Sequence, residues 1–133
     1  MITLRLVTPQ GDGFTEEVEK IILRGIEGDL MLMQGTAPLV TPLAYGAIRI
    51  FQDGAARTGA IHGGYVSMKS DVATVATDAF EWIEDIDVER ARAAKDRAET
   101  YLRDNADETK AEIDKAKLAL LRATNRLDVV DKR

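Results

Sequence analysis

The sequence predicts an α+β chain in which a β-sandwich comes first and a helical hairpin follows. All ten glycines lie between Gly11 and Gly64, and the three prolines fall within residues 9–42. Short apolar or alternating runs recur about every ten residues in this part, which is typical of a small β-sandwich. After residue 85 the apolar spacing changes to three and four, which is typical of helices. We therefore expect a β-sandwich domain over 1–84 and a helical hairpin over 85–133.

Composition excludes several classes of function. A chain of 133 residues, 45% hydrophobic and 31% charged, is long enough for one domain with an appendage. It has no cysteine and only one histidine, His62, which argues against disulfides, thiolate nucleophiles and a zinc site. Its net charge of −5 opposes nucleic-acid binding. We expect neither a signal peptide nor a membrane-spanning helix, because the chain opens into a strand pattern and has no long apolar run.

The strand pattern makes further predictions about single residues. Residues 30–33 are apolar on both faces, which predicts a central strand or a strand that faces a partner. His62 is expected at a sheet edge or a partner contact, and Trp82 at the junction of the two halves. The predicted strands are centred on residues 3–7, 18–23, 29–33, 47–51, 60–61, 65–68 and 72–76.

Two apolar stripes predict the hairpin. The first stripe is mostly alanine, so the helices can approach closely but bury little apolar area, about 0.8 kcal/mol for each methyl-sized group. We therefore expect the hairpin to be the less stable half and able to open. The first stripe is Ala91, Ala94, Ala98 and Tyr101, and the second is Ile113, Ala116, Leu120, Ala123, Leu127 and Val130.

Polar residues mark where these helices begin. Asp87 is placed to cap the first helix, with Ile86 packing on Ala91 as a hydrophobic staple. Asn105 and Glu108 have the spacing of a capping box and predict the start of the second helix. The carboxylates of residues 81–87 are thereby better explained by structure than by acid–base catalysis, since no nucleophile or ligating imidazole lies near them in the sequence. We expect a non-catalytic protein without a metal site.

The arginines of the hairpin leave two interpretations open. Arg122 and Arg126 are one turn apart, and neither has an acidic residue three or four positions away. Arg90 and Arg97 are seven apart, so they lie on one edge of the hairpin. Four guanidinium groups on such a surface can clamp a polyphosphate. They can equally pair with acidic groups of a partner or of the first domain.

The order of motifs resembles the ε subunits of bacterial F-type ATP synthases, over the whole chain. The residues that support the resemblance are 7–9 (Val-Thr-Pro), 27–30 (Glu-Gly-Asp-Leu), 37–43 (Ala-Pro-Leu-Val-Thr-Pro-Leu), 63–65 (Gly-Gly-Tyr), 85–91 and 119–127. The resemblance implies a ten-stranded β-sandwich followed by an antiparallel two-helix hairpin at the C-terminus. It also implies a non-catalytic subunit of the central stalk, placed between the γ subunit and the c-ring of a proton- or sodium-translocating enzyme.

The same resemblance implies a regulatory role. In this family the hairpin can extend toward the α and β subunits and inhibit ATP hydrolysis. The expected location is the cytoplasmic side of the inner membrane, peripheral to it through the complex. Asp29 stands where an acidic residue of the family approaches the c-ring. Two residues depart from the family pattern nearby, because Met31 replaces a glycine and Thr36 replaces a histidine.

Some bacterial members bind ATP on the folded hairpin through an Ile/Leu-Asp-x-x-Arg-Ala motif. Here the motif is Ile86, Asp87, Arg90 and Ala91, and further matching positions are Glu81, Arg97, Arg122 and Arg126. The resemblance thus implies ATP as a regulatory ligand, with or without Mg²⁺. A purely structural coupling subunit with no nucleotide site is the alternative, and a small free-standing enzyme has only the acidic cluster of residues 81–87 in its favour.

Overall fold

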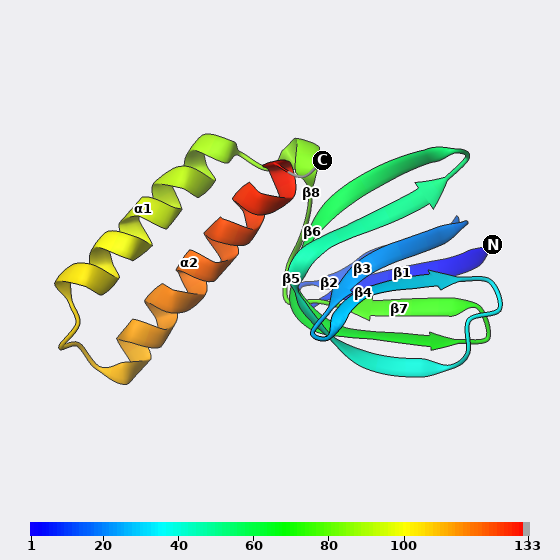
Figure 1. Cartoon of the computed structure of the whole chain (residues 1–133), viewed down its shortest axis with the longest axis horizontal. Coiled ribbons are helices and arrows are strands. Elements are labelled where there is room, and N and C mark those ends of the chain that lie inside the picture. The colour runs from blue at the N-terminus through cyan, green and yellow to red at the C-terminus, as the bar shows by residue number, and fades with distance from the viewer. Residues whose placement is uncertain (132–133) are drawn as a thin grey trace. The chain divides into compact units, whose positions relative to one another are not determined.

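The computed structural model describes residues 1–131, with the backbone alone at Asp12. The chain divides into two compact units, Met1–Trp82 and Ile83–Arg133 (Figure 1). Every strand lies in the first unit and both long helices in the second. The division falls two residues before the predicted boundary at 84/85, at the point where the last strand ends.

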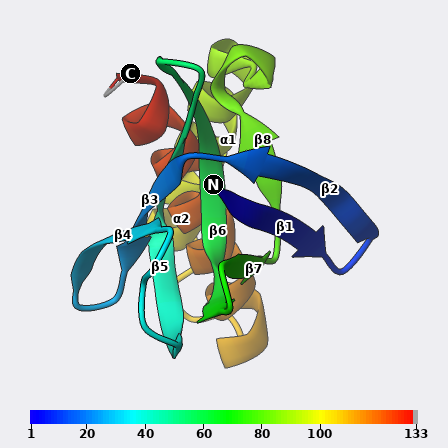
Figure 2. The same cartoon turned by 90° about the vertical axis from the view of Figure 1, so that its right-hand side faces the viewer.

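The first unit holds eight strands in one sheet that coils back on itself (Figure 2). The spatial order is β2-β1-β7-β6-β5-β3-β4, with β8 also paired to β6. All neighbours run antiparallel except β1 and β7, which run parallel. The strands are β1 (Ile2–Thr8), β2 (Gly11–Val18), β3 (Lys20–Gly25), β4 (Gly28–Met33), β5 (Leu39–Gln52), β6 (Ala55–Lys69), β7 (Val72–Ala76) and β8 (Phe80–Trp82).

Two long strands explain why the sandwich has eight strands where ten were expected. Strand β6 pairs with β7 through residues 65–69 and with β8 through residues 59–61. Strand β5 pairs with β3 only through residues 43–51, while its first residues pair with the end of β6. Each long strand therefore serves both layers of the sandwich. The predicted β-sandwich class is confirmed, and the count of ten was wrong because β5 and β6 run through the bend instead of ending there.

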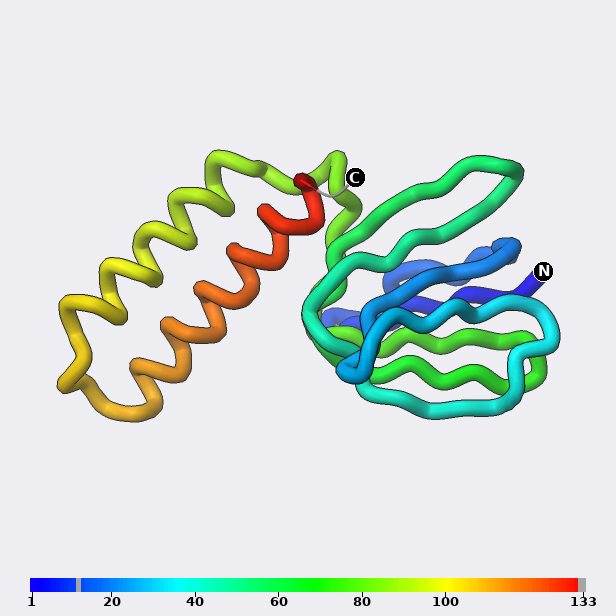
Figure 3. Tube along the Cα trace, in the orientation of Figure 1, coloured from blue at the N-terminus to red at the C-terminus, as the bar shows by residue number. Residues whose placement is uncertain are grey.

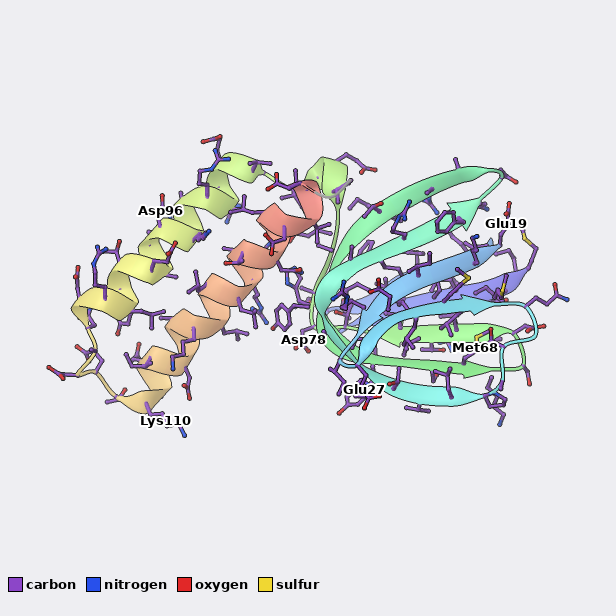
Figure 4. The ribbon with its side chains drawn as sticks, viewed as in Figure 1. Glu19, Glu27, Met68, Asp78, Asp96 and Lys110 are labelled. Carbon is purple, nitrogen blue, oxygen red and sulfur yellow. The ribbon has the colours of Figure 1, made fainter. Side chains whose placement is uncertain are left out.

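The core lies between the two layers and follows the period of two in each strand. In β1 the buried residues are Ile2, Leu4 and Leu6, and in β6 Met68 points inward (Figure 4). Branched aliphatic side chains dominate the rest of this core. Its members are Ile2, Leu4, Leu6, Val18, Ile21, Leu23, Leu32, Leu43, Ile48, Ile50, Ile61, Val66, Met68, Ala73 and Val75.

Two strand-level predictions are corrected by the sheet order. The Met-rich strand β4 is an edge strand, so the first of its two predicted alternatives, a central strand, was wrong, and the partner-facing strand stays a prediction. Leu32 is buried there, whereas Met31 and Met33 are 50% and 44% exposed. His62 is 0% exposed in the interior strand β6, so it is not a sheet-edge residue. Both errors arose because the sequence pattern shows which residues alternate but not which strands neighbour one another.

Trp82 belongs to an aromatic cluster within the first unit. Its ring stacks on Phe14 at 5.5 Å between centroids and meets Phe80 edge-on at 4.9 Å. The Arg57 guanidinium lies 4.7 Å from the Trp82 ring centroid and also pairs with Glu16. Cation–π and aromatic contacts of this kind fix a ring more firmly than apolar burial alone. Trp82 is therefore a reporter of the sandwich.

The second unit is an antiparallel hairpin, visible in the path of the chain (Figure 3). A short 3₁₀ turn, η1 (Ile83–Asp85), precedes α1 (Val88–Asp104) and α2 (Lys110–Asp131). The predicted cap is confirmed, because the Arg90 backbone N–H donates to Asp87 Oδ1 at 3.0 Å. The two alanines Ala91 and Ala98 are the buried residues of α1.

The predicted start of the second helix was wrong by one turn. Asn105 ends α1, since its backbone N–H and its Nδ2 both donate to the Tyr101 carbonyl, at 2.9 and 3.1 Å. Helix α2 begins at Lys110, and the Glu112 N–H donates to Thr109 Oγ1 at 3.4 Å. Thr109 and Glu112 have the capping-box spacing as well, so two overlapping signals competed in the sequence.

Gly64 is the glycine that allows β6 to approach β7 closely. Its φ is +108°, and a Cβ there would overlap with the Ala76 carbonyl oxygen of the neighbouring strand. We predict that Gly64→Ala lowers the free energy of unfolding by more than about 3 kcal/mol. At Gly54, where φ is +76° and no atom lies within 4 Å, alanine should cost only about 1 kcal/mol.

Urea denaturation followed by Trp82 fluorescence measures both variants. Equal losses at the two glycines would show that the close approach of β6 and β7 does not limit residue 64.

Candidate functional site

The first turn of α1 brings four of the expected nucleotide-site residues together. Ile86 and Ala91 are buried, while Asp87 and Arg90 are exposed. The Ala91 N–H donates to the Asp87 carbonyl at 2.9 Å, and the Arg90 N–H donates to the Asp87 carboxylate. The Asp87 side chain therefore caps one N–H group of the first turn. A phosphate at this site would lie beside the Asp87 carboxylate, so its binding would depend on the arginine side chains.

Two of the expected arginines lie on α1. Arg90 and Arg97 are separated by seven residues, which is two turns and about 10 Å along a helix. Both are exposed, and no ion pair of either appears among residues 1–131. A distance of this size is comparable to the length of a triphosphate with its ribose.

The other two arginines lie on the C-terminal half of α2. Arg122 and Arg126 are one turn apart and both are half-buried. Arg122 Nε is buried and has no hydrogen-bond partner among the described residues. A buried guanidinium N–H without an acceptor is costly, so Arg122 is the residue of this set that most requires an external acceptor.

The hairpin topology places these two pairs near one another. Because α1 and α2 run antiparallel, the C-terminal half of α2 lies beside the N-terminal half of α1 (Figure 1). Arg90 at the start of α1 and Arg122 and Arg126 near the end of α2 thus belong to the same end of the hairpin, with Arg97 toward the middle. Guanidinium groups bind both phosphates and carboxylates in a bidentate manner, so this end of the hairpin can bind a polyphosphate or the acidic side chains of a protein partner.

Glu81, the eighth residue expected in the nucleotide site, belongs to the first unit. It lies in β8, and its Oε1 is 3.8 Å from Nε2 of the buried His62. Tyr45 packs edge-on against the His62 ring at 5.5 Å. Sequence reasoning missed this pairing of Glu81 with His62. This pair could be predicted only from the register of β6 and β8. Glu81 pairs with Ala60, and His62 lies two residues further along β6 on the same face of the sheet.

An open groove of about 790 Å³ runs between the helices near the interhelical loop. Its lining includes four alanines and Tyr101. Partial burial, with smaller contributions from the Glu108 and Glu112 carboxylates, raises the pKa of the Tyr101 hydroxyl above its usual value. Of the expected nucleotide-site residues only Arg97 lines this groove. The groove residues are Ala94, Asp96, Arg97, Ala98, Thr100, Tyr101, Asp104, Asn105, Glu112, Lys115, Ala116 and Ala119.

Within residues 1–131 no group of three His, Asp or Glu side chains is placed to hold a metal ion. No helix in that range is long and apolar enough to cross a bilayer.

Asp29, the expected contact for the c-ring, is exposed at the start of β4. Its Oδ1 accepts a hydrogen bond from Arg24 Nε at 2.7 Å, across the β3–β4 pair. Its carboxylate is thus partly neutralised within the chain, and a partner would meet an Arg24–Asp29 pair instead of an isolated charge. The sequence shows both residues, but their cross-strand register is a result of the fold.

Asp87 has two separable properties, its charge and its cap. We predict that Asp87→Ala lowers the free energy of unfolding of the hairpin by about 1 kcal/mol, because a first-turn N–H loses its acceptor. Asp87→Asn keeps an acceptor oxygen and should leave that stability nearly unchanged. Urea denaturation followed by circular dichroism at a helical wavelength compares the two; an equal loss in both variants would contradict the capping role.

Comparison with known families identifies both units. Residues 1–83 match the family described as "ATP synthase, Delta/Epsilon chain, beta-sandwich domain". Residues 84–131 match the family described as "ATP synthase, Delta/Epsilon chain, long alpha-helix domain". The two matches together span nearly the whole chain.

Individual relatives agree with these families. The chain is 41% identical over 128 residues to the "ATP synthase epsilon chain" of Bacillus velezensis, covering 96% of each chain. It is 40% identical over 126 residues to that of Halalkalibacterium halodurans, covering 95% of this chain and 94% of the relative. Among solved structures, a chain of the Euglena gracilis mitochondrial ATP synthase superposes with a TM-score of 0.78 at 22% identity. That superposition covers 98% of this chain and 79% of the other, and it supports the fold.

Proposed function

The chain belongs to the ATP synthase delta/epsilon family, and we propose that it acts as the ε subunit of the central stalk of a proton- or sodium-translocating F-type ATP synthase. In this proposal it is a non-catalytic subunit that couples the γ subunit to the c-ring. It is peripheral to the cytoplasmic side of the inner membrane through the complex. The match of both units, in the same order as in full-length epsilon chains, supports this role.

The sandwich supplies surfaces suited to rotor partners. Single exposed apolar side chains are common on soluble domains, but neighbouring ones that form a patch mark partner contacts. Val40 on β5 is 74% exposed, and Tyr65 on the paired strand β6 is 60% exposed. Asp29, paired with Arg24, is the residue we assign to the c-ring contact.

The hairpin is the proposed regulatory element, with ATP as its ligand, with or without Mg²⁺. The observation that supports this most directly is the half-buried Arg122, on the same end of the hairpin as Arg90, whose Nε has no hydrogen-bond acceptor within the described part of the chain. We assign the triphosphate to the guanidinium groups of Arg90, Arg97, Arg122 and Arg126. Ile86, Asp87 and Ala91 complete the proposed site within the hairpin. Glu81, the remaining position taken from the family pattern, belongs to the first unit.

The proposed regulation of ATP hydrolysis requires that ATP binds the folded hairpin and not the open one. A ligand that binds the folded hairpin stabilises it by RT ln(1 + [ATP]/Kd), about 2.7 kcal/mol at a hundredfold excess over Kd. When ATP falls, the hairpin opens and its basic residues become free to meet the α and β subunits, where the extended helices inhibit ATP hydrolysis. The alternative, a purely structural coupling subunit, would leave the arginines to acidic groups of protein partners.

The arginines distinguish these two roles. We predict that MgATP binds the purified chain saturably, and that Arg90→Gln and Arg122→Gln each weaken binding by about ten- to a hundredfold, since each removes a charged hydrogen bond to phosphate. Arg103→Gln is the matched control, because Arg103 is an exposed arginine at the far end of α1. Calorimetric titration with MgATP and with ATP in EDTA measures all four proteins.

Absence of heat at millimolar ATP in the unsubstituted chain would reject the nucleotide site and leave the structural role. Equal weakening in Arg103→Gln would show that general charge and not the proposed site attracts ATP.

Truncation tests inhibition separately. Removal of residues 88–133 deletes both helices and leaves the sandwich strands intact. We predict that the truncated chain still assembles with the rotor and that ATP hydrolysis by the assembled enzyme rises. Hydrolysis assays on complexes matched for subunit content make the comparison; an unchanged rate would contradict the inhibitory role of the hairpin.

A further inference from the structure

The groove between α1 and α2 near the interhelical loop shares only Arg97 with the proposed nucleotide site. Arg90, Arg122 and Arg126 lie outside its lining. Figure 4 labels Asp96, one of the lining residues, on α1. The volume of about 790 Å³ falls within the range in which proteins bind small organic molecules. The groove therefore offers the hairpin a second place for a ligand.

Alanines on both helices leave this groove open. The lining contains Ala94 and Ala98 of α1 and Ala116 and Ala119 of α2. Ala94 and Ala116 are half-buried and Ala119 is exposed, whereas Ala123, one turn further along α2, is completely buried. The contact between the helices is thus closed at Ala123 and open toward the loop. An apolar chain laid along these methyl groups would remove their surface and its own from water.

Charge divides the lining of the groove into two ends. The end near the interhelical loop carries Tyr101, Asp104 and Glu112. The other end carries Asp96, Arg97 and Lys115. Arg97 is one turn before Tyr101 on α1, and Lys115 is about one turn after Glu112 on α2. Both cations of the lining therefore lie at the end away from the loop.

The loop end combines an aromatic ring with carboxylates that have no cation of their own. Asp104 Oδ1 lies 3.5 Å from Arg103 Nε, but no ion pair of Glu108 or Glu112 occurs within the described residues. Burial, and then these two carboxylates, raise the pKa of the Tyr101 hydroxyl above its usual value. The carboxylates therefore act at the Tyr101 side chain. A positive group placed there is attracted both by them and by the face of the ring.

We propose that this groove binds a small organic cation with an apolar chain or ring, as a second ligand site of the hairpin. The positive group lies at the loop end, against the Tyr101 ring and the Glu112 carboxylate. The apolar part lies along the alanines toward Ala94. Ala94 and Tyr101 are seven residues apart, about 10 Å along a helix, which sets the length of the ligand.

Such a ligand contacts both helices, so it stabilises the closed hairpin. The site consists only of hairpin residues and does not depend on the proposed nucleotide site or on the role in the central stalk.

The first test compares two probes of matched length on the purified full chain, 6-phenylhexylamine and 6-phenylhexanoate, which are a cation and an anion at neutral pH. We expect the amine to bind about tenfold more tightly than the carboxylate. Amide chemical shifts in NMR titrations measure both affinities, and the largest shifts should fall within residues 94–119. Equal affinity for the two probes, no binding of the amine, or largest shifts outside that range overturns the proposal.

Substitutions then locate the positive group. We expect Glu112→Gln and Tyr101→Leu each to weaken binding of the amine about fivefold, because one removes a charge and the other a ring. The matched control Glu99→Gln removes the same charge from an exposed residue of α1 outside the lining and should leave the affinity unchanged. Glu112→Gln keeps the size of the side chain, so it decides the question if Tyr101→Leu fails to fold. Equal weakening in Glu99→Gln, or an unchanged affinity in Glu112→Gln, overturns the proposal.

Other occupants of the groove give different results in the same titrations. If a second copy of the chain covers the groove, the affinity for the amine falls as the chain concentration rises, and sedimentation shows a dimer. If a basic protein segment occupies it, a helical peptide of leucine and lysine binds where 6-phenylhexylamine does not. Either result overturns the proposal, whereas an affinity for the amine that is independent of chain concentration supports it.

Discussion

Helix α1 buries only alanine side chains, and this small buried area makes the proposed regulation energetically feasible. Ala91 and Ala98 are the buried residues of α1, and Ala123 is the most buried residue of α2. The largest fully buried side chains of the chain all belong to the sandwich. Since each buried methyl-sized group contributes only about 0.8 kcal/mol, a ligand worth 2 to 3 kcal/mol matters greatly to the hairpin and little to the sandwich.

The start of α1 couples helix formation to the proposed ligand site. Asp87 caps the helix by accepting a hydrogen bond from the backbone N–H of Arg90, one turn later. The guanidinium of the same Arg90 is one of the groups assigned to phosphate. When the hairpin frays at this end, the cap is lost and Arg90 is displaced at the same time. Binding and folding of this turn are therefore linked, as expected of an element that responds to a ligand by changing its population of states.

The sequence predicted the order of the two units, the strand periodicity and the alanine stripe, because each is a local pattern. It did not predict that β4 is an edge strand or that His62 is interior, because both depend on which strands are neighbours. The start of α2 was misplaced because Asn105 and Thr109 both fit a capping box, and the Asn105 side chain instead ends α1. The arginines of the candidate site were visible from spacing, whereas the Glu81–His62 pair required the register of β6 and β8.

The central claim is that the hairpin opens more readily than the sandwich and that ATP holds it shut. Native-state hydrogen exchange of the purified chain, with and without MgATP, tests this most directly. The account predicts that amides of α1 and α2 exchange much faster than those of β1 and β6 without nucleotide, and that saturating MgATP slows the helical amides selectively. Equal protection of both units, or protection of the helices that MgATP does not change, would contradict it.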